Sequence, residues 1–299
     1  MNGFDQLNRY VFNQANVRGE LVRLEDSLQH IVHSYEYPPQ IQGLLSEMAA
    51  ATCLLTAILK FKGEIGLQIQ SEGPVKYAVI HATHEQTLRG VARWDESLPV
   101  LPQNFTDLVA KAVLVITITP QDGERYQGVV ALDKPTLAEC LEGYFEQSEQ
   151  LSTKVMLMTD LSDPERARAA GMLLQVLPTS AESTKANGNP EFDHLCKLTE
   201  TLTEEEMFSL PVNDILYRLY HQENVELYDP QTIRFACSCS RERSAEALRN
   251  VDKAELLHII EEEGAIKMSC QYCHTEYRFD AIDVEAIHGG HFGSTPANQ

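Results

Sequence analysis

The sequence predicts an α+β protein that carries a small metal-binding module near its C-terminus. Stretches in which apolar residues run or alternate between turn residues indicate strands, and apolar residues three or four positions apart indicate helices. Both patterns occur in the first part of the chain, and two close pairs of cysteines follow in the last part. With 299 residues, of which 43% are hydrophobic, the chain can bury one large core and one small core.

Residues 1–179 are expected to form the core domain, in which strands and helices pack together. Apolar residues at helical spacing predict a helix over residues 41–60. Two strands are predicted over residues 65–70 and 75–80, because a Gly-Pro turn separates these two apolar segments.

A second strand pair is predicted over residues 113–119 and 126–132, around an Asp-Gly step that is typical of a hairpin. Thr136 is expected to cap the helix that follows this pair. Residues 154–158 and 172–176 have the apolar pattern of two further strands.

Residues 180–232 are expected to be a helical linker between the core domain and the module. Residues 180–190 are polar and rich in turn formers, and helical patterns follow over residues 192–201 and 204–221. Helices of this length are marginal in water, so their apolar stripes have to pack on another part of the protein.

Residues 233–288 are expected to form the metal-binding module, with a flexible tail over residues 289–299. A strand over residues 233–235 leads into the first cysteine pair. Helices are predicted over residues 244–248 and 252–263, between the two cysteine pairs.

Four cysteines of the module have the spacing of a tetrahedral zinc site: Cys237, Cys239, Cys270 and Cys273. The first pair is a C-x-C, the second is a C-x-x-C, and thirty residues separate them. A short fold that joins the pairs surrounds Zn²⁺ with four sulfur ligands. This closed site leaves no position for a catalytic water and disfavours a hydrolytic zinc enzyme. His274, beside Cys273, is expected to point away from the ion.

The remaining cysteines, Cys53, Cys140 and Cys196, stand singly among apolar residues and are expected to be core residues. Arg241 and Arg243 follow the first cysteine pair, and we expect them to offset the negative charge of four thiolates. The alternative is that both arginines are solvated residues at the start of a helix.

The cysteine spacing alone leaves a static structural zinc module and a redox switch both open. Structural zinc contributes roughly 10–16 kcal/mol of apparent binding free energy, whereas a whole domain is net stable by about 5–15 kcal/mol. A module of this size should therefore unfold when it loses the metal. Oxidation of a ligand thiol to sulfenic acid and then to a disulfide would remove the metal. The amphipathic linker favours the switch, because its release would uncover apolar surface that can bind other proteins.

The net charge of −20 argues against nucleic acid or an anionic membrane as a partner, although a nucleic-acid-binding zinc ribbon is one alternative function. A thiol oxidoreductase that uses Cys270 and Cys273 is another, and it would need a thioredoxin-like helix start. No secretory signal is visible, and the most apolar stretch, residues 48–59, is too short for a membrane span. We therefore expect a cytoplasmic protein. No Gly-rich phosphate loop is visible, which fits an activity without ATP.

An ordered set of motifs covers nearly the whole chain: Tyr37-Pro38-Pro39, Leu59-Lys60-Phe61-Lys62-Gly63, Gln68-Ile69-Gln70, Tyr144-Phe145-Glu146-Gln147-Ser148-Glu149-Gln150, Ala169-Ala170-Gly171-Met172-Leu173-Leu174-Gln175, Phe235-Ala236-Cys237-Ser238-Cys239-Ser240-Arg241 and Cys270-Gln271-Tyr272-Cys273. With this set the sequence resembles the heat shock protein 33 family, the redox-regulated bacterial holdases also called 33-kDa chaperonins. Small departures from the family pattern, at Ser71-Glu72 and at Ser152, fall at turns.

The resemblance implies that the four cysteines bind one Zn²⁺ per chain in the reduced, inactive protein. It implies that oxidation forms the disulfides Cys237–Cys239 and Cys270–Cys273, that zinc leaves, and that the module and the linker unfold. Homodimers then hold unfolding client proteins under oxidative stress and later pass them to ATP-driven refolding chaperones. The resemblance implies a chaperone of the cytoplasm that is not an enzyme.

Overall fold

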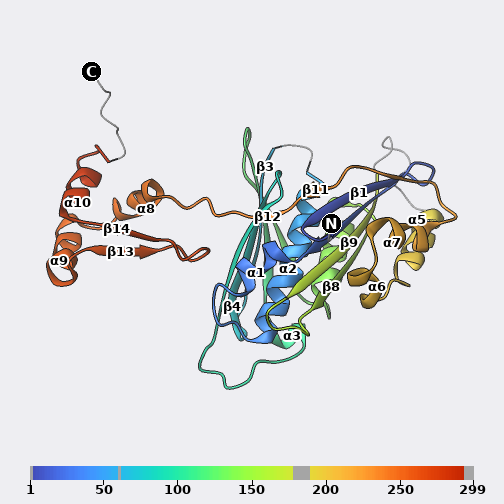
Figure 1. Ribbon diagram of the computed structural model, residues 1–299, viewed down its shortest axis with the longest axis horizontal. Coiled ribbons are helices and arrows are strands. Elements are labelled where there is room, and N and C mark those ends of the chain that lie inside the picture. Colours follow the sequence, from blue (N-terminus) through green and yellow to red (C-terminus); the bar gives the residue numbers. More distant parts are fainter. Residues whose placement is uncertain (1–2, 60–61, 178–188, 293–299) are drawn as a thin grey trace. The chain divides into compact units, whose positions relative to one another are not determined.

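The computed structural model describes residues 3–59, 62–177 and 189–292 (Figure 1). The chain folds as two units, Met1–Ala236 and Cys237–Gln299. The first unit holds two six-stranded sheets and most of the helices, and the second holds a two-stranded sheet and three helices of the described chain. This mixture confirms the α+β class.

The first sheet of unit Met1–Ala236 is antiparallel, with the strand order β10-β1-β2-β9-β8, and β11 also pairs with β1. Its strands are β1 (Gln6–Phe12), β2 (Val17–Leu24), β8 (Thr153–Asp160), β9 (Arg168–Val176), β10 (Val225–Leu227) and β11 (Gln231–Thr232).

The second sheet has the order β12-β5-β4-β3-β6-β7 and is antiparallel except where β12 runs parallel to β5. Its strands are β3 (Gly63–Gln70), β4 (Val75–Thr83), β5 (Thr87–Trp94), β6 (Val113–Pro120), β7 (Tyr126–Ala131) and β12 (Arg234–Phe235). The β3–β4 and β6–β7 pairs confirm both hairpins expected from the Gly-Pro and Asp-Gly turns.

Helix α2 (Pro39–Ala57) packs against strands of both sheets and forms the centre of the main core. Buried residues occur all round this helix, as is typical of a helix enclosed by protein. It confirms the helix expected over residues 41–60, of which residue 60 lies outside the described chain. The other helical segments of the core are α1 (Asp26–Val32), α3 (Phe105–Leu108), α4 (Leu137–Tyr144), which Thr136 caps as expected, and the π-helical turn η1 (Phe145–Glu149).

Strand β9 is buried on both faces, and each face belongs to a different core. Leu173 packs with α2, whereas Met172 and Leu174 point to the opposite face because side chains alternate along a strand. This opposite face, which we call the outer face, also carries Tyr10 and Leu21 from β1 and β2.

Three linker helices cover the outer face: α5 (Pro190–Thr199), α6 (Glu204–Ser209) and α7 (Val212–Tyr220), drawn in gold in Figure 1. Leu195, Ile215 and Leu219 are almost completely buried against it. The expectation that the apolar stripes of the linker pack on another part of the protein is therefore confirmed.

Two expectations for this region are wrong in detail. Residues 204–221 form two helices rather than one, because Leu210 is extended and Pro211, which has no N–H, begins a new helix. Strand β12, expected to open the metal-binding module, pairs with β5 and belongs to unit Met1–Ala236. The expected turn-rich segment 180–190 lies mostly outside the described residues, as do residues 293–299 of the expected tail.

The unit Cys237–Gln299 has a small core of its own. Its elements are α8 (Arg241–Leu248), α9 (Lys253–Glu263), β13 (Ile266–Ser269), β14 (Glu276–Phe279) and α10 (Ala281–His288). Seven hydrophobic side chains are buried among them, with Phe279 fully enclosed: Ala245, Leu248, Leu256, Ile266, Phe279, Val284 and Ile287. So small a core supplies little stability by itself.

Candidate metal centre

The four cysteines of the C-terminal unit lie in two short connections. Cys237 and Cys239 precede α8, while Cys270 and Cys273 lie in the turn between β13 and β14. In that turn the Cys270 N–H donates to the Thr275 carbonyl at 3.0 Å, and the His274 N–H donates to the Cys270 carbonyl at 2.9 Å. These bonds fix the backbone so that both sulfurs leave the turn on the same side.

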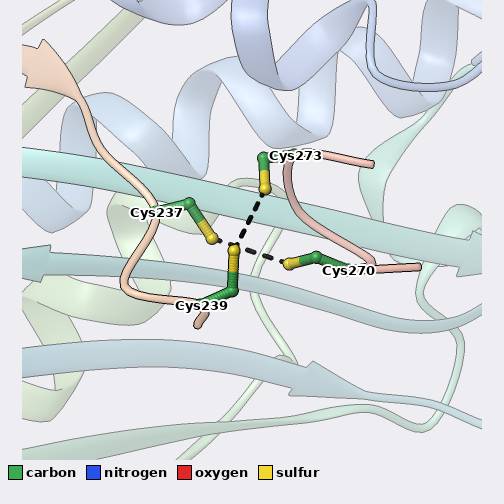
Figure 2. Close-up of side chains that lie close together, drawn as sticks. All are labelled: Cys237, Cys239, Cys270 and Cys273. Carbon is green, nitrogen blue, oxygen red and sulfur yellow. Dashed lines mark hydrogen bonds between the residues drawn. The ribbon is translucent and has the colours of Figure 1, made fainter. Parts of the chain in front are cut away.

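The four sulfur atoms point toward one another, as Figure 2 shows, and all lie within 4.8 Å of each other. Cys237 Sγ is 3.6 Å from Cys270 Sγ, and Cys239 Sγ is 3.3 Å from Cys273 Sγ. A tetrahedron with Zn–S bonds of about 2.3 Å has edges of about 3.8 Å. The donor set and its spacing therefore fit one Zn²⁺, and all four are free thiols.

Two hydroxyl groups extend the cluster beyond the sulfurs. The Tyr277 hydroxyl donates to Cys239 Sγ at 3.2 Å, and the Thr275 hydroxyl lies 3.3 Å from Cys273 Sγ. Groups of this kind orient metal ligands and stabilise their charge. Neither role was predicted from the sequence. The sequence does contain a pattern that could have predicted the role of Tyr277. Tyr277 and the buried Phe279 are two residues apart in a short strand next to the cysteine pair, so their side chains lie on the same face.

The surroundings give the thiols different acidities in the metal-free protein. Burial, together with hydrogen bonding among the thiols, raises the pKa of Cys237 to about 12 and also raises the pKa of Cys239. Burial acts in the same direction on Cys273, but hydrogen bonds with the side chain and backbone of Thr275 outweigh it and lower the pKa of Cys273 to about 7. Cys273 is thus the readiest of these three thiols to become a thiolate.

The arginines after the first cysteine pair make different contacts from those expected. Arg241 bonds Asp283 at 2.6 Å, and its guanidinium lies 5.0 Å from the centre of the Phe279 ring. Arg243 donates to the Ser238 carbonyl and to the Ser238 hydroxyl, each at 2.8 Å. Arg243 therefore stabilises the backbone between Cys237 and Cys239, whereas Arg241 joins the start of α8 to α10. The contacts found for them are with oxygen and aromatic groups.

The other candidate ligands remain apart from the cluster. His274 is exposed, has a left-handed backbone with φ of 56°, and is not among the four clustered ligand residues. Cys53 and Cys140 are buried in the main core, and Cys196 packs at the edge of the outer-face core. The prediction that these cysteines are core residues is therefore confirmed for Cys53 and Cys140, whereas Cys196 is half-buried. Burial raises the pKa of all three thiols.

The arrangement is closed and rich in thiols. Four ligands around one ion leave no coordination position for a substrate or a water. The C-x-x-C pair lies in a turn between antiparallel strands, whereas a thioredoxin-like site would have it at the start of a helix. The cluster is thus suited to hold a metal and to give it up when the sulfurs are oxidised.

None of the helices in the described ranges is long and apolar enough to cross a membrane.

Fold and cluster together define a two-unit α+β protein with four clustered thiols that could hold a metal ion. The family model described as Hsp33 protein matches residues 5–280. A "33 kDa chaperonin" of Pseudoalteromonas atlantica is 67% identical over 295 residues, which cover 99% of each chain. A "33 kDa chaperonin" of a Shewanella species is 52% identical over 290 residues, 97% of this chain and 98% of the relative. The chain therefore belongs to the Hsp33 family.

A solved structure confirms the fold. The crystal structure of the 33 kDa chaperonin (heat shock protein 33 homolog) from Thermotoga maritima superposes with a TM-score of 0.79. The match covers 96% of this chain and 98% of that chain, with 22% sequence identity.

Proposed function

We propose that this protein is a molecular chaperone that works without ATP and is switched on by oxidation. In the reduced state Cys237, Cys239, Cys270 and Cys273 would hold one Zn²⁺ and keep the chaperone inactive. The observation that carries this proposal is the convergence of four thiols, from two distant connections, to within 4.8 Å of each other. Membership of the Hsp33 family and the names of its relatives support the chaperone role.

The chemistry of the switch follows from the thiols. Two thiols and one molecule of peroxide give one disulfide and two molecules of water, so two peroxide molecules oxidise the whole cluster. The family resemblance supports the pairs Cys237–Cys239 and Cys270–Cys273. A disulfide cannot serve as two thiolate ligands, and the ion is released. Because the C-terminal unit buries only a small core, loss of the metal should unfold it.

The unit boundary explains how unfolding could reach the linker. Cys237 follows directly on Ala236, whose N–H donates to the Leu88 carbonyl at 2.9 Å beside β12. Between α7 and this point the strands that pair the chain with the core are β10, β11 and β12, which have three, two and two residues. The Tyr228 and Ile233 N–H groups add hydrogen bonds to the Arg9 and Asp5 carbonyls, and the Ile233 side chain is buried in the main core. Such short strands give up few hydrogen bonds when they detach. We therefore propose that the linker is released once the module has unfolded.

Release of the linker would supply the surface that binds clients. The outer face carries Tyr10, Phe12, Leu21 and Met172, which are at most 2% exposed while the helices cover them. An uncovered apolar patch of this kind binds the apolar segments of unfolding proteins. In this proposal residues 1–179 are the core domain, residues 180–232 the linker and residues 237–288 the switch, with β12 pairing on the core just before it. The outer face and the freed linker hold the client.

The remaining partners belong to the same proposal. Active molecules would form homodimers and pass their clients, after reduction, to ATP-driven refolding chaperones in the cytoplasm. The protein would catalyse no reaction of its own. The net charge of −20 supports a partner other than nucleic acid or an anionic membrane.

The proposal is tested by light scattering of a thermally unfolding client protein. Protein oxidised with peroxide at mildly raised temperature should suppress aggregation, whereas reduced protein at the same temperature should not. The matched control is the reduced protein treated with peroxide that catalase has already destroyed. If oxidised, metal-free protein gave no protection, the proposed activity would be wrong.

A further inference from the structure

Arg23 is a buried cation of β2 whose side chain reaches the linker. Only 3% of the residue is exposed. Its Nη1 donates to the Leu210 carbonyl at 2.7 Å and to the Met207 carbonyl at 3.3 Å, and its Nε donates to the Gly3 carbonyl at 3.1 Å. Among the described residues these carbonyl groups are its polar partners, and no ion pair there includes it. Burying a charge is costly unless hydrogen bonds compensate it, so the bonds from Arg23 to these carbonyl groups are strong.

The two linker carbonyls lie at the C-terminal end of α6, where a cation stabilises the helix. Within a helix the Met207 carbonyl would accept a bond from the N–H four residues later, but that residue is Pro211 and has no N–H. The end of a helix also carries partial negative charge. Arg23 therefore takes the place of the missing donor. Without its guanidinium, docked α6 would bury carbonyl groups that lack partners.

An alternating stack of guanidinium groups and aromatic rings extends this contact. The Arg23 guanidinium lies 4.9 Å from the centre of the Phe4 ring, and the Arg168 guanidinium lies 5.8 Å from it. Arg168 also lies 5.2 Å from the Phe208 ring of α6, and the Phe4 and Phe208 rings are parallel at 6.5 Å. Phe208 thus comes from the linker, whereas the other three members of the stack come from the core.

The backbone at Gly3 packs closely against Arg23 in this stack. Gly3 has φ of +60°, a conformation that favours glycine, and a Cβ there would lie 2.4 Å from Arg23 Nη2. Any larger residue would push the guanidinium away from the carbonyl groups it bonds. The sequence of this segment is therefore compatible with the buried position of Arg23.

We propose that Arg23, Phe4 and Arg168 form an arginine latch that holds α6 on the core independently of the metal. Arg23 acts as a positioning residue, because it stands on the same face of β2 as Leu21 and joins this outer face to the end of α6 through the Met207 and Leu210 carbonyl groups. The consequence for activity rests on the proposed function, since it assumes that a released linker exposes the client-binding surface. The latch itself does not depend on that assumption.

The test compares Arg23→Met with Arg18→Met in the full-length, reduced, zinc-loaded protein. Arg18 is on the opposite face of the same strand, and its side chain bonds Gln175 within the core. Amide hydrogen exchange should become faster in α6 and α7 of Arg23→Met, on the order of ten- to a hundredfold, because charge-assisted hydrogen bonds and desolvated cation–π contacts are lost. Exchange in α2 and the zinc content should not change. Arg23→Lys should restore part of the protection, because lysine can donate to the carbonyl groups but cannot stack as a plane.

Each outcome decides the proposal. Unchanged exchange in the linker of Arg23→Met would overturn the latch. Equal acceleration in α2 and the linker would also overturn it, because that pattern means general destabilisation, and so would the same linker effect in Arg18→Met. Faster exchange confined to the linker supports the latch. If that change came without any protection of clients by the reduced variant, the latch would stand and the proposed route to activity would be wrong.

Discussion

The Tyr277 hydroxyl donates a hydrogen bond to the sulfur of Cys239 across 3.2 Å. The bond raises the pKa of the tyrosine to about 12, as expected for a donor beside a group that carries negative charge. The same bond should stabilise the thiolate form of Cys239 and thus the bound metal.

Tyr277→Phe removes this hydroxyl and keeps the ring. We expect weaker zinc binding by about 10–100-fold, the usual effect of losing a partner that orients a metal ligand. Competition with a chromophoric chelator measures the affinity. Tyr217→Phe is the control, since Tyr217 lies 74% exposed on the linker, in the other unit. Equal zinc affinity in the Tyr277 variant and the native protein would show that the bond has no role in holding the metal.

Neighbouring residues of α7 allow a matched test of linker docking. Leu216 is 5% exposed and packs on the outer face, whereas Tyr217 is 74% exposed. Leu216→Glu would bury a charge without a partner, so the linker should detach and the reduced protein should protect a client while it still holds zinc. Tyr217→Glu should stay inactive until oxidised. Light scattering and a zinc assay on both variants give the answer, and an inactive Leu216→Glu protein with a released linker would contradict the proposed client surface.

Disulfides within the two cysteine pairs and disulfides between the pairs predict different peptides after trypsin digestion. Cys237 and Cys239 share the peptide of residues 235–241, and Cys270 and Cys273 share that of residues 268–278. We expect two separate peptides, each lighter by two hydrogen atoms, in the mass spectrum of oxidised protein. Disulfides within the pairs close very short loops and constrain the chain little, so the module is free to unfold.

The shortest sulfur contacts of the reduced cluster are instead between pairs, at 3.6 Å for Cys237–Cys270 and 3.3 Å for Cys239–Cys273. Links of that kind would close loops of about thirty residues and stabilise the module by about 3 kcal/mol or more. A single joined peptide would therefore contradict the proposed switch.

Glu20 of β2 makes stability depend on pH. It is 2% exposed, and burial raises its pKa from 4.5 to about 7 against the opposing charges of Arg18 and Arg9. The folded protein then holds the proton more tightly than the unfolded chain. The contribution of Glu20 to stability is therefore fully present below pH 4.5 and is lost as the pH rises through 7.

Glu20→Gln cannot ionise and should be more stable than the native protein above pH 7, by up to about 3 kcal/mol. The difference should shrink toward pH 5. Urea unfolding of reduced protein, followed by the fluorescence of Trp94, the single tryptophan, measures this across the range. Glu165→Gln, at an exposed position, should show no such dependence. A constant difference between the two proteins at all pH values would rule out the ionisation of Glu20 as the cause.

Much of this architecture could be predicted because its signals are local. The spacing of apolar residues located α2 and the two hairpins, and the spacing of Cys237, Cys239, Cys270 and Cys273 indicated which sulfurs come together. Thr136 was identified as a cap because a single side chain and the backbone of the next turn are enough to form one.

The contacts that were missed join residues far apart in the sequence. Strand β2 contains the buried charged residues Glu20 and Arg23, which hide its strand pattern, and their environment comes from the paired strands and the linker. The pairing of β12 with β5 joins Phe235 to Leu88, and no local pattern reports such a partner. Pro211 indicates that the helix breaks at Leu210. The apolar residues at helical spacing before and after this point nevertheless favoured one continuous helix.

The measurement that tests the central claim most directly counts zinc and free thiols on the same sample, before and after peroxide. The reduced protein should contain one zinc ion per chain, and oxidation should release that ion as four thiols disappear, while Cys53, Cys140 and Cys196 remain reduced. A reduced protein that is folded without metal would contradict the account. So would an oxidised protein that keeps its zinc.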